Sequence, residues 1–274
     1  MGMITDFKVS INGREINVKA PKLELDSSLK ELADYLGKPY DTFKKELEKV
    51  SSKFGGFGKY VKVTEDEWNS MKIDQNDINE VMGFYAQTEN YMPELTIIAS
   101  TEDKQRLCKF AIGYCLKNNV KTVVDYGCGV GQVSIIGALN GLNMTAVDIE
   151  GKTFEFTKWK FKKYGLNVKT IEIKNDAPLK EKYDAITCFE VLQHVPDIEK
   201  TLEHFHDSLN ENGLLLVTRR FIGNYSLVLK KNEKYEDIFE DVVKNKGFEL
   251  VEKVHMWGDK DKTGKWLEIY KKSS

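Results

Sequence analysis

The 274-residue sequence contains no run approaching the ~18 consecutive apolar residues that a membrane-spanning helix needs. Its N-terminus also lacks the apolar core of a signal peptide, so we expect a cytoplasmic protein with no membrane partner. Lys and Arg total 41 against 43 Asp and Glu, which gives a net charge of −2. The excess of basic charge typical of a dedicated nucleic-acid binder is therefore missing, and this disfavours a nucleic-acid partner.

Cysteine is scarce. The chain has four, and they form neither a CxxC pair nor a Cys/His cluster with the spacing of zinc ligands. This argues against a disulfide scaffold and against a zinc module. Cys108 and Cys115 lie seven residues apart on one face of an expected helix, where free cysteine behaves as a small buried hydrophobe.

The first 101 residues are expected to form a small unit of strands and helices. Apolar residues alternate over 7–11 and 16–20 around Asn12-Gly13, which predicts a hairpin with a two-residue turn. Ser28 with Glu31 resembles a capping box for a helix that stops at Gly37, and a second helix is expected from about residue 41. We predict a domain boundary near residue 101.

From residue 102 to 274 helical and strand patterns alternate, which favours a parallel sheet with crossover helices. The end of the chain departs from this alternation. Expected strands over 248–255 and 266–270 are joined by a turn-rich loop, and two such strands pair antiparallel. The predicted fold class is α/β, with a mostly parallel sheet and an antiparallel last strand.

A glycine-rich turn follows the first strand of this region. Asp125 precedes Gly127, Gly129 and Gly131, and a missing Cβ at such positions lets the backbone approach a ligand closely. Asp148 lies 21 residues after Gly127, at the end of the next expected strand. A carboxylate there can accept hydrogen bonds from both hydroxyls of a ribose. The two features together indicate a nucleoside-binding site.

The spacing of the glycines separates two kinds of cofactor. A dinucleotide fingerprint needs glycine three residues after Gly129, where this chain has Gln132, and a GxxxxGK[ST] phosphate loop is also missing. An acidic residue followed by G-x-G-x-G is instead similar to the first motif of the class I, Rossmann-like S-adenosylmethionine-dependent methyltransferases. The resemblance covers residues 102–274 and implies a sheet of seven strands.

The resemblance also implies roles for individual residues. Gly127, Gly129 and Gly131 would form the loop under the methionine part of S-adenosylmethionine. Asp125 would lie near its amino group, and Asp148 would bind the ribose.

Further along the chain, Asp176 and Ala177 match the segment that contacts adenine after the third strand of the family. The segment 189–196 resembles the end of the fourth strand in the ubiquinone-biosynthesis-like branch, and it would line the methyl donor.

Glu190, Gln193 and His194 share one face if a helix begins at this point, since their spacing is i, i+3, i+4. His194 could be a general base, because imidazole titrates near neutral pH. Some relatives carry E-x-x-E-H here as a metal site, which Gln193 weakens because a neutral amide is a poorer ligand than a carboxylate. The third alternative for Glu190 and His194 is a structural or cofactor-contact role.

Tyr85 and Tyr91 precede the methyltransferase-like region, where relatives place a segment that closes over cofactor and acceptor. Each offers an apolar wall with one hydroxyl, as in small-molecule pockets, or belongs to the core. Arg219 and Arg220 end the fifth expected strand, where they could contact an anionic acceptor or lie in solvent, and we expect them to be solvated.

The function expected from this resemblance is methyl transfer from S-adenosylmethionine, with S-adenosylhomocysteine as product, to an O, N or C atom of a small molecule. The segment after the fourth strand lacks the [DN]PP[YF] motif of amino-group methylation, and the Pro-Cys motif of cytosine methylation is also missing. One alternative is a methyltransferase acting on a protein or a tRNA, and another is a non-catalytic module that binds S-adenosylmethionine.

Overall fold

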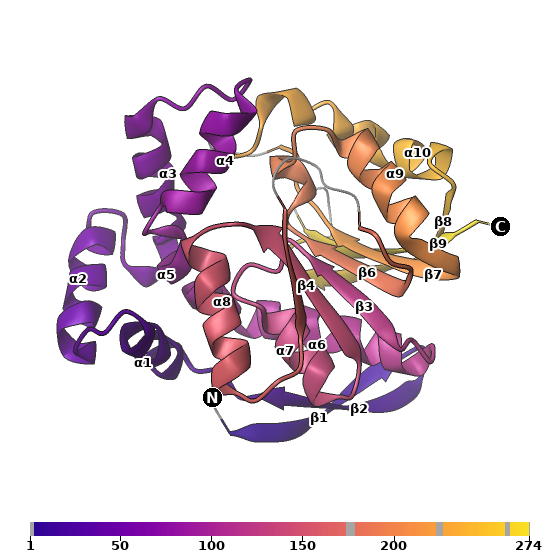
Figure 1. Cartoon of the computed structure of the whole chain (residues 1–274), viewed down its shortest axis with the longest axis horizontal. Helices are drawn as coiled ribbons and strands as arrows, with labels where there is room; N and C mark the ends of the chain where they lie inside the picture. Colours follow the sequence, from indigo (N-terminus) through magenta and orange to yellow (C-terminus); the bar gives the residue numbers. More distant parts are fainter. Residues whose placement is uncertain (1–2, 174–178, 223–226, 261–263, 274) are drawn as a thin grey trace.

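A computed structural model describes residues 3–173, 179–222, 227–260 and 264–273 of the chain. A seven-stranded sheet with helices on both faces forms its centre, and a hairpin lies beneath it (Figure 1). The strands of the large sheet are β3 (Thr122–Tyr126), β4 (Asn143–Ile149), β5 (Lys169–Ile173), β6 (Tyr183–Phe189), β7 (Leu209–Thr218), β8 (Phe248–Trp257) and β9 (Lys265–Lys272).

The strand order is β5-β4-β3-β6-β7-β9-β8. Strands β3 to β7 run parallel, and β9 enters antiparallel between β7 and β8. The expected α/β sheet with its antiparallel last strand is therefore confirmed. The order reverses between β3 and β6, because the chain continues from β3 to β4 on one side and from β6 to β7 on the other. In open α/β sheets, ligands bind at the carboxyl edge of such a point.

Helices cover both faces of the sheet because successive strand residues point to opposite sides. In β6, Ala185 packs against one set of helices and Ile186 against the other. One face carries α6 (Glu102–Lys117), α7 (Gln132–Leu139) and α8 (Lys152–Lys163), and the other carries α9 (Ile198–Ser208) and α10 (Tyr235–Asn245). Both faces are buried, as the continuous apolar patterns of the strands require. Cys108 and Cys115 are among the buried side chains, as predicted.

The hairpin joins β1 (Ile4–Ile11) to β2 (Arg14–Pro21) through Asn12 and Gly13. These two residues have φ values of 50° and 74°, which is the conformation that a two-residue turn between twisted strands requires. This confirms the predicted hairpin. Its inner face packs on α6 and α7 and shares one hydrophobic cluster with the large sheet.

Five helices follow the hairpin: α1 (Leu25–Tyr35), α2 (Tyr40–Ser52), α3 (Val61–Met71), α4 (Ile78–Gln87) and α5 (Tyr91–Ala99). The predicted capping box at Ser28 is wrong, because α1 begins three residues earlier. The hydroxyl of Ser27 binds the backbone N–H and carbonyl of Glu24 and closes the first turn there. The apolar face predicted for this helix is nevertheless buried, at Leu29, Leu32 and Ala33.

Helices α4 and α5 position the N-terminal unit against the carboxyl edge of the sheet. Their side chains Tyr85 and Tyr91 pack with Ile149, the last residue of β4. No helix within the described ranges is long and apolar enough to cross a membrane.

Candidate functional site

The glycine-rich loop connects β3 to α7 at the carboxyl edge of the sheet. Gly127, Gly129 and Gly131 have φ values of 68°, 53° and 73°, a region that side chains disfavour and glycine does not. The loop lies close to β4, since the N–H of Gly127 donates to the carbonyl of Val147 at 2.8 Å. The glycines predicted from the sequence are therefore required by the backbone.

Asp148 at the end of β4 is joined directly to this loop. Its Oδ2 accepts the N–H of Gly129 at 2.7 Å, and its Oδ1 accepts the N–H of Ile149 at 2.8 Å. Burial raises the pKa of Asp148 to about 6, although both N–H groups act in the opposite direction. The two sequence features expected to bind one nucleoside are thus within hydrogen-bond distance of each other.

Asp125 lies beneath the loop. Its Oδ2 accepts the N–H and the hydroxyl of Ser134, at 3.1 and 2.8 Å, and its Oδ1 accepts the hydroxyl of Thr187 at 3.2 Å. Only 4% of Asp125 is exposed, and this burial raises its pKa. In this arrangement Asp125 ties α7 and β6 to the loop, and its contact with a ligand stays a prediction.

Gln132 is the first residue of α7 and directly follows the last glycine. It is 6% exposed, and neither its amide oxygen nor its amide nitrogen has a hydrogen-bond partner within the described residues. An unsatisfied buried amide is costly, and a polar ligand group beside it would remove the cost. Beside the glycine loop, this orphaned amide suits a cofactor with its own donors and acceptors.

Two apolar side chains cover the loop. Val191 belongs to the segment 189–196 that was expected to line the methyl donor, whereas the sequence did not indicate Leu95. A methyl group added to Gly127 would lie 2.3 Å from Cγ2 of Val191, and one added to Gly129 would lie 3.0 Å from Cδ1 of Leu95. Val191 comes from the segment after β6, and Leu95 comes from α5. Their proximity to the glycines depends on the tertiary fold, because their sequence positions are 64 and 34 residues away.

Glu190 does not begin a helix, so the expected shared face with Gln193 and His194 is wrong. Its φ is 62°, and only a short 3-10 helix follows over Leu192–His194. A helix does not begin at Glu190 because its backbone pairs with β7: the N–H of Glu190 donates to the carbonyl of Thr218 at the end of that strand.

The carboxylate of Glu190 is paired with Lys265 at the start of β9, with both oxygens 2.8 Å from Nζ. Burial alone would raise the pKa of Glu190, but the charge and hydrogen bonds of Lys265 hold it below its ordinary value. The described residues contain no group of three or more His, Cys, Asp or Glu able to hold a metal ion. Both oxygens of Glu190, which a metal ion at this position would need as ligands, are therefore paired with Lys265.

His194 is held by Tyr85 and by a backbone carbonyl. Its Nδ1 lies 2.9 Å from the carbonyl oxygen of Leu227 and 2.9 Å from the Tyr85 hydroxyl. Because a carbonyl only accepts, Nδ1 carries the proton and the lone pair of the neutral ring is on Nε2. Burial lowers the pKa of His194, so the ring is neutral at pH 7. The Tyr91 ring lies 5.3 Å from that of Tyr85, which brings the predicted tyrosines and histidine together.

Asp176 and Ala177, expected at the adenine, lie outside the described residues. Arg219, expected to be solvated, is buried at its guanidinium, which pairs with Glu268 at 3.2 Å and lies over Phe239. The prediction failed because β9, which carries Glu268, is inserted beside β7 from a distant part of the chain.

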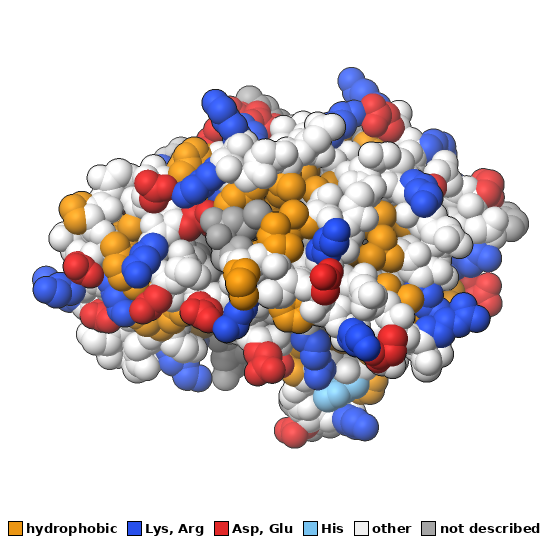
Figure 2. Space-filling model, turned by 90° about the horizontal axis from the view of Figure 1, so that it is seen from below, with side chains coloured by type: hydrophobic (Ala, Val, Ile, Leu, Met, Phe, Trp, Pro, Cys, Tyr) orange, Lys and Arg blue, Asp and Glu red, His pale blue; other side chains and the backbone are white. Residues whose placement is uncertain are grey.

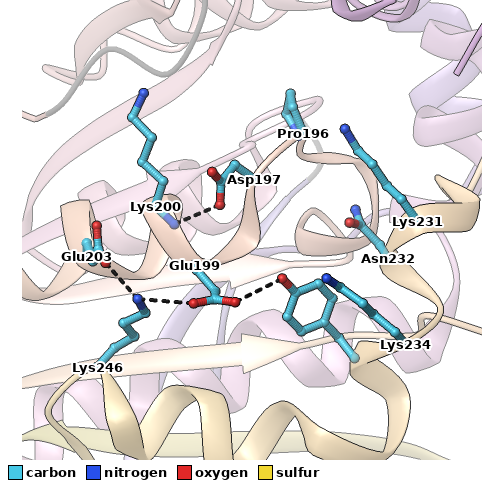
Figure 3. A pocket seen from close by; sticks show the side chains of 10 residues that line it. Pro196, Asp197, Glu199, Lys200, Glu203, Lys231, Asn232, Lys234 and Lys246 are labelled. Carbon is cyan, nitrogen blue, oxygen red and sulfur yellow. Dashed lines mark hydrogen bonds and ion pairs between the residues drawn. The ribbon is translucent and has the colours of Figure 1, made fainter. Parts of the chain in front are cut away.

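A pocket of about 580 Å³ lies between α9 and α10 (Figure 3). Its carboxylates are already paired: Lys246 contacts Glu203 at 2.6 Å and Glu199 at 3.2 Å, and Tyr235 donates to Glu199 at 3.3 Å. Among the described residues that line it, none belongs to the glycine loop or to the His194 cluster. This pocket is therefore separate from the predicted site.

Comparison with known proteins decides the family. The profile of the family described as "Methyltransferase domain" matches residues 100–253, which is more than half of the chain. The chain belongs to this family. The resemblance stated from the glycine motif is thereby confirmed.

The curated relatives carry a narrower name. A ubiquinone biosynthesis O-methyltransferase from Histophilus somni (strain 2336) is 34% identical over 102 residues, 35% of this chain and 43% of that enzyme. Another, from Actinobacillus pleuropneumoniae serotype 7 (strain AP76), is 32% identical over 118 residues, 40% of this chain and 50% of that enzyme. The match thus spans half or less of the length of these relatives.

Solved structures support the fold of this methyltransferase-family chain. An S-adenosylmethionine-dependent methyltransferase from Clostridium acetobutylicum ATCC 824 aligns with a TM-score of 0.52 at 16% identity, over 65% of this chain and 95% of that one. Magnesium protoporphyrin IX methyltransferase from Synechocystis PCC 6803 gives 0.53 at 19% identity, over 78% of this chain and all of that one. At these identities the likeness concerns the fold.

Proposed function

We propose that this chain transfers a methyl group from S-adenosylmethionine to a small-molecule acceptor. The observation that carries the proposal is the direct hydrogen bond between Asp148 and Gly129. This bond joins a carboxylate suited to binding ribose hydroxyls to a glycine loop, at the point where the strand order of the sheet reverses. The family membership and the O-methyltransferase names of the relatives support the same reaction class.

The residues present fit the cofactor. The carboxylate of Asp148 would accept the two ribose hydroxyls, and the backbone of Gly127 to Gly131 would lie under the methionine part. The buried amide of Gln132 supplies a donor and an acceptor that lack partners in the described chain. The structure of the segment with Asp176 and Ala177 is not described, and the adenine contact expected there stays part of the proposal. When bound, S-adenosylmethionine supplies an activated methyl group on a sulfonium.

The acceptor side is proposed to be the cluster of Tyr85, Tyr91 and His194. With its Nδ1 proton directed at the Leu227 carbonyl, His194 would take the acceptor proton on Nε2. Tyr85 is a neutral phenol, since burial raises its pKa well above the ordinary value, and it orients the imidazole through its hydroxyl. Glu190 is proposed to act through its ion pair with Lys265, close enough to Tyr91 for its charge to act on that phenol, and not as a metal ligand.

In such a transfer the methyl group is already activated. Most of the rate acceleration therefore comes from aligning the acceptor atom with the methyl group and from excluding water. The tyrosines and the apolar side chains of Leu95 and Val191 suit both purposes.

The charge of one face of the molecule bears on the choice between a small acceptor and a tRNA. On the face seen from below, which includes the hairpin, Lys and Arg side chains alternate with Asp and Glu among the described residues (Figure 2). An RNA-binding surface would gather basic side chains into one patch. This face therefore offers no support for a tRNA acceptor.

The test is a calorimetric titration with S-adenosylmethionine and with S-adenosylhomocysteine. The parent is expected to bind both, and Asp148→Ala should weaken binding by about 1 to 3 kcal/mol, the loss of charge-assisted hydrogen bonds. Asp207→Asn, an exposed site on the far end of α9, serves as the control. Absence of binding to the parent would overturn the proposal.

Turnover is then measured with a panel of phenols, amines and carbon acids, and with bulk tRNA and protein. Methylation of a small molecule is expected. Binding without turnover on any acceptor would instead favour a non-catalytic module.

A further inference from the structure

Helix α8 also contacts the glycine loop, at Gly131, and it contains no residue of the predicted site. It lies beside the carboxyl end of β4 (Figure 1). The hydroxyl of Thr157 donates to the carbonyl of Gly129 at 2.6 Å, and Nζ of Lys160 donates to the carbonyl of Val130 at 2.6 Å. Thr157 and Lys160 are three residues apart, so they lie on one face of the helix. Two consecutive carbonyls of the loop are thus anchored by α8.

Anchoring a carbonyl also fixes the direction of the next N–H. The peptide unit is planar and trans, so the N–H of Val130 points away from the carbonyl of Gly129, and the N–H of Gly131 points away from that of Val130. The Gly131 N–H closes a turn onto the carbonyl of Cys128 at 2.8 Å. The anchors therefore determine how the loop presents its backbone to a ligand.

The loop needs such anchors because glycine is conformationally free. Three residues with positive φ lose more backbone entropy on ordering than other residues would, and nothing in their own side chains holds them. Contact with α8 is also close: a methyl group on Gly131 would lie 2.6 Å from Cγ2 of Thr157.

Lys160 is an unusual residue to place here. It is 8% exposed, and burial lowers its pKa to about 8, with Glu31 and Cys128 acting in the opposite direction. Its other described contact is the ring of Phe156, 5.2 Å from Nζ. A buried ammonium is costly, and its hydrogen bond to a carbonyl is correspondingly strong.

We propose that Thr157 and Lys160 are positioning residues, which hold the glycine loop in the geometry that binds the nucleoside sulfonium cofactor. The proposal rests on the proposed function for the identity of the ligand, but the ordering of the loop by α8 does not depend on it.

Matched variants on the same helix test the role of Thr157. Thr157→Val keeps the shape and removes the donor, whereas Thr157→Ser keeps the donor. Thr153→Val is the control, because the Thr153 hydroxyl is buried and has no partner within the described residues. Thr157→Val is expected to weaken S-adenosylmethionine binding about tenfold, the loss of one buried hydrogen bond, while the other two variants bind as the parent does.

The role of Lys160 is tested by Lys160→Met, with Lys162→Met on the exposed face as control. We expect about tenfold weaker binding for Lys160→Met and an unchanged KM for the acceptor, since the acceptor contacts are elsewhere. A merely structural role would lower the melting temperature without this separation of cofactor from acceptor.

Hydrogen exchange of the ligand-free proteins gives a readout that needs no cofactor. The amides of residues 129–131 should exchange faster in Thr157→Val and Lys160→Met than in the parent and the controls. Parent-like exchange and parent-like affinity in both variants would overturn the inference. If the parent binds no S-adenosylmethionine, the proposed function fails, and the exchange data still decide whether α8 orders the loop.

Discussion

The raised pKa of Asp148 has a consequence for stability as well as for binding. In the folded chain its carboxylate titrates at about 6, compared with an ordinary value of 3.8, because burial disfavours the charge. Between these values the folded protein retains a proton that the unfolded chain has lost. Stability therefore falls as the pH rises from 4 to 6, and the loss is complete above pH 6.

The size of this effect follows from the two pKa values. Their difference, at 1.36 kcal/mol per pH unit, corresponds to about 3 kcal/mol. Asp148→Asn removes the titration, so the variant should gain about 3 kcal/mol relative to the parent between pH 4 and pH 7. In the parent, the same protonation should weaken binding of S-adenosylmethionine about tenfold for each pH unit below 6, since a protonated acid cannot accept both ribose hydroxyls.

Urea unfolding of parent and variant at half-unit intervals from pH 4 to pH 7 measures the difference. Asp184→Asn is a control for a carboxylate with the opposite shift. Burial would raise the pKa of Asp184, but hydrogen bonds from the N–H groups of Lys121 and Thr122 outweigh it and lower that pKa below the ordinary value of 3.8. Asp184 is therefore ionised in both the folded and the unfolded chain above about pH 5, so the difference in stability between this variant and the parent should stay constant from there to pH 7. A difference for Asp148→Asn that stays constant across the range would refute the reasoning.

Three further outcomes are expected. Gly127→Ala should destabilise the fold by at least about 2 kcal/mol in thermal unfolding and abolish cofactor binding, because its methyl group would meet Val191 at 2.3 Å; a parent-like melting temperature would contradict this. His194→Gln should lower kcat about 100-fold and remove the acidic limb of the pH–rate profile, and an unchanged profile would exclude the role of base. Lys265→Met leaves Glu190 unpaired and should cost about 1 to 3 kcal/mol, less than a fully buried pair because the Glu190 side chain is 36% exposed; Glu190→Gln in the same background should restore part of the loss in urea unfolding.

Local pattern was sufficient for much of the fold and for the centre of the site. The Asn12-Gly13 turn, the glycine loop and the acid at the end of the next strand each depend on a few adjacent residues and on the period of the strands. Parallel strands bring their carboxyl ends to one edge, so the nearness of Asp148 to Gly129 followed from the order of elements.

Only the tertiary structure decided which charges and hydrogen bonds are satisfied by distant partners. The backbone of Glu190 pairs with β7 and its carboxylate with Lys265, and these contacts replaced the helix expected from the spacing of Glu190 and His194. Arg219 is buried because β9 brings Glu268 beside it.

The anchors Thr157 and Lys160 were invisible in the sequence for the same reason. A hydrogen bond or ion pair acts within a few ångströms, and the chain brings such groups together from positions tens of residues apart. The periodicity of the sequence determined the elements and their order, whereas the partners of the buried polar groups were determined when those elements packed.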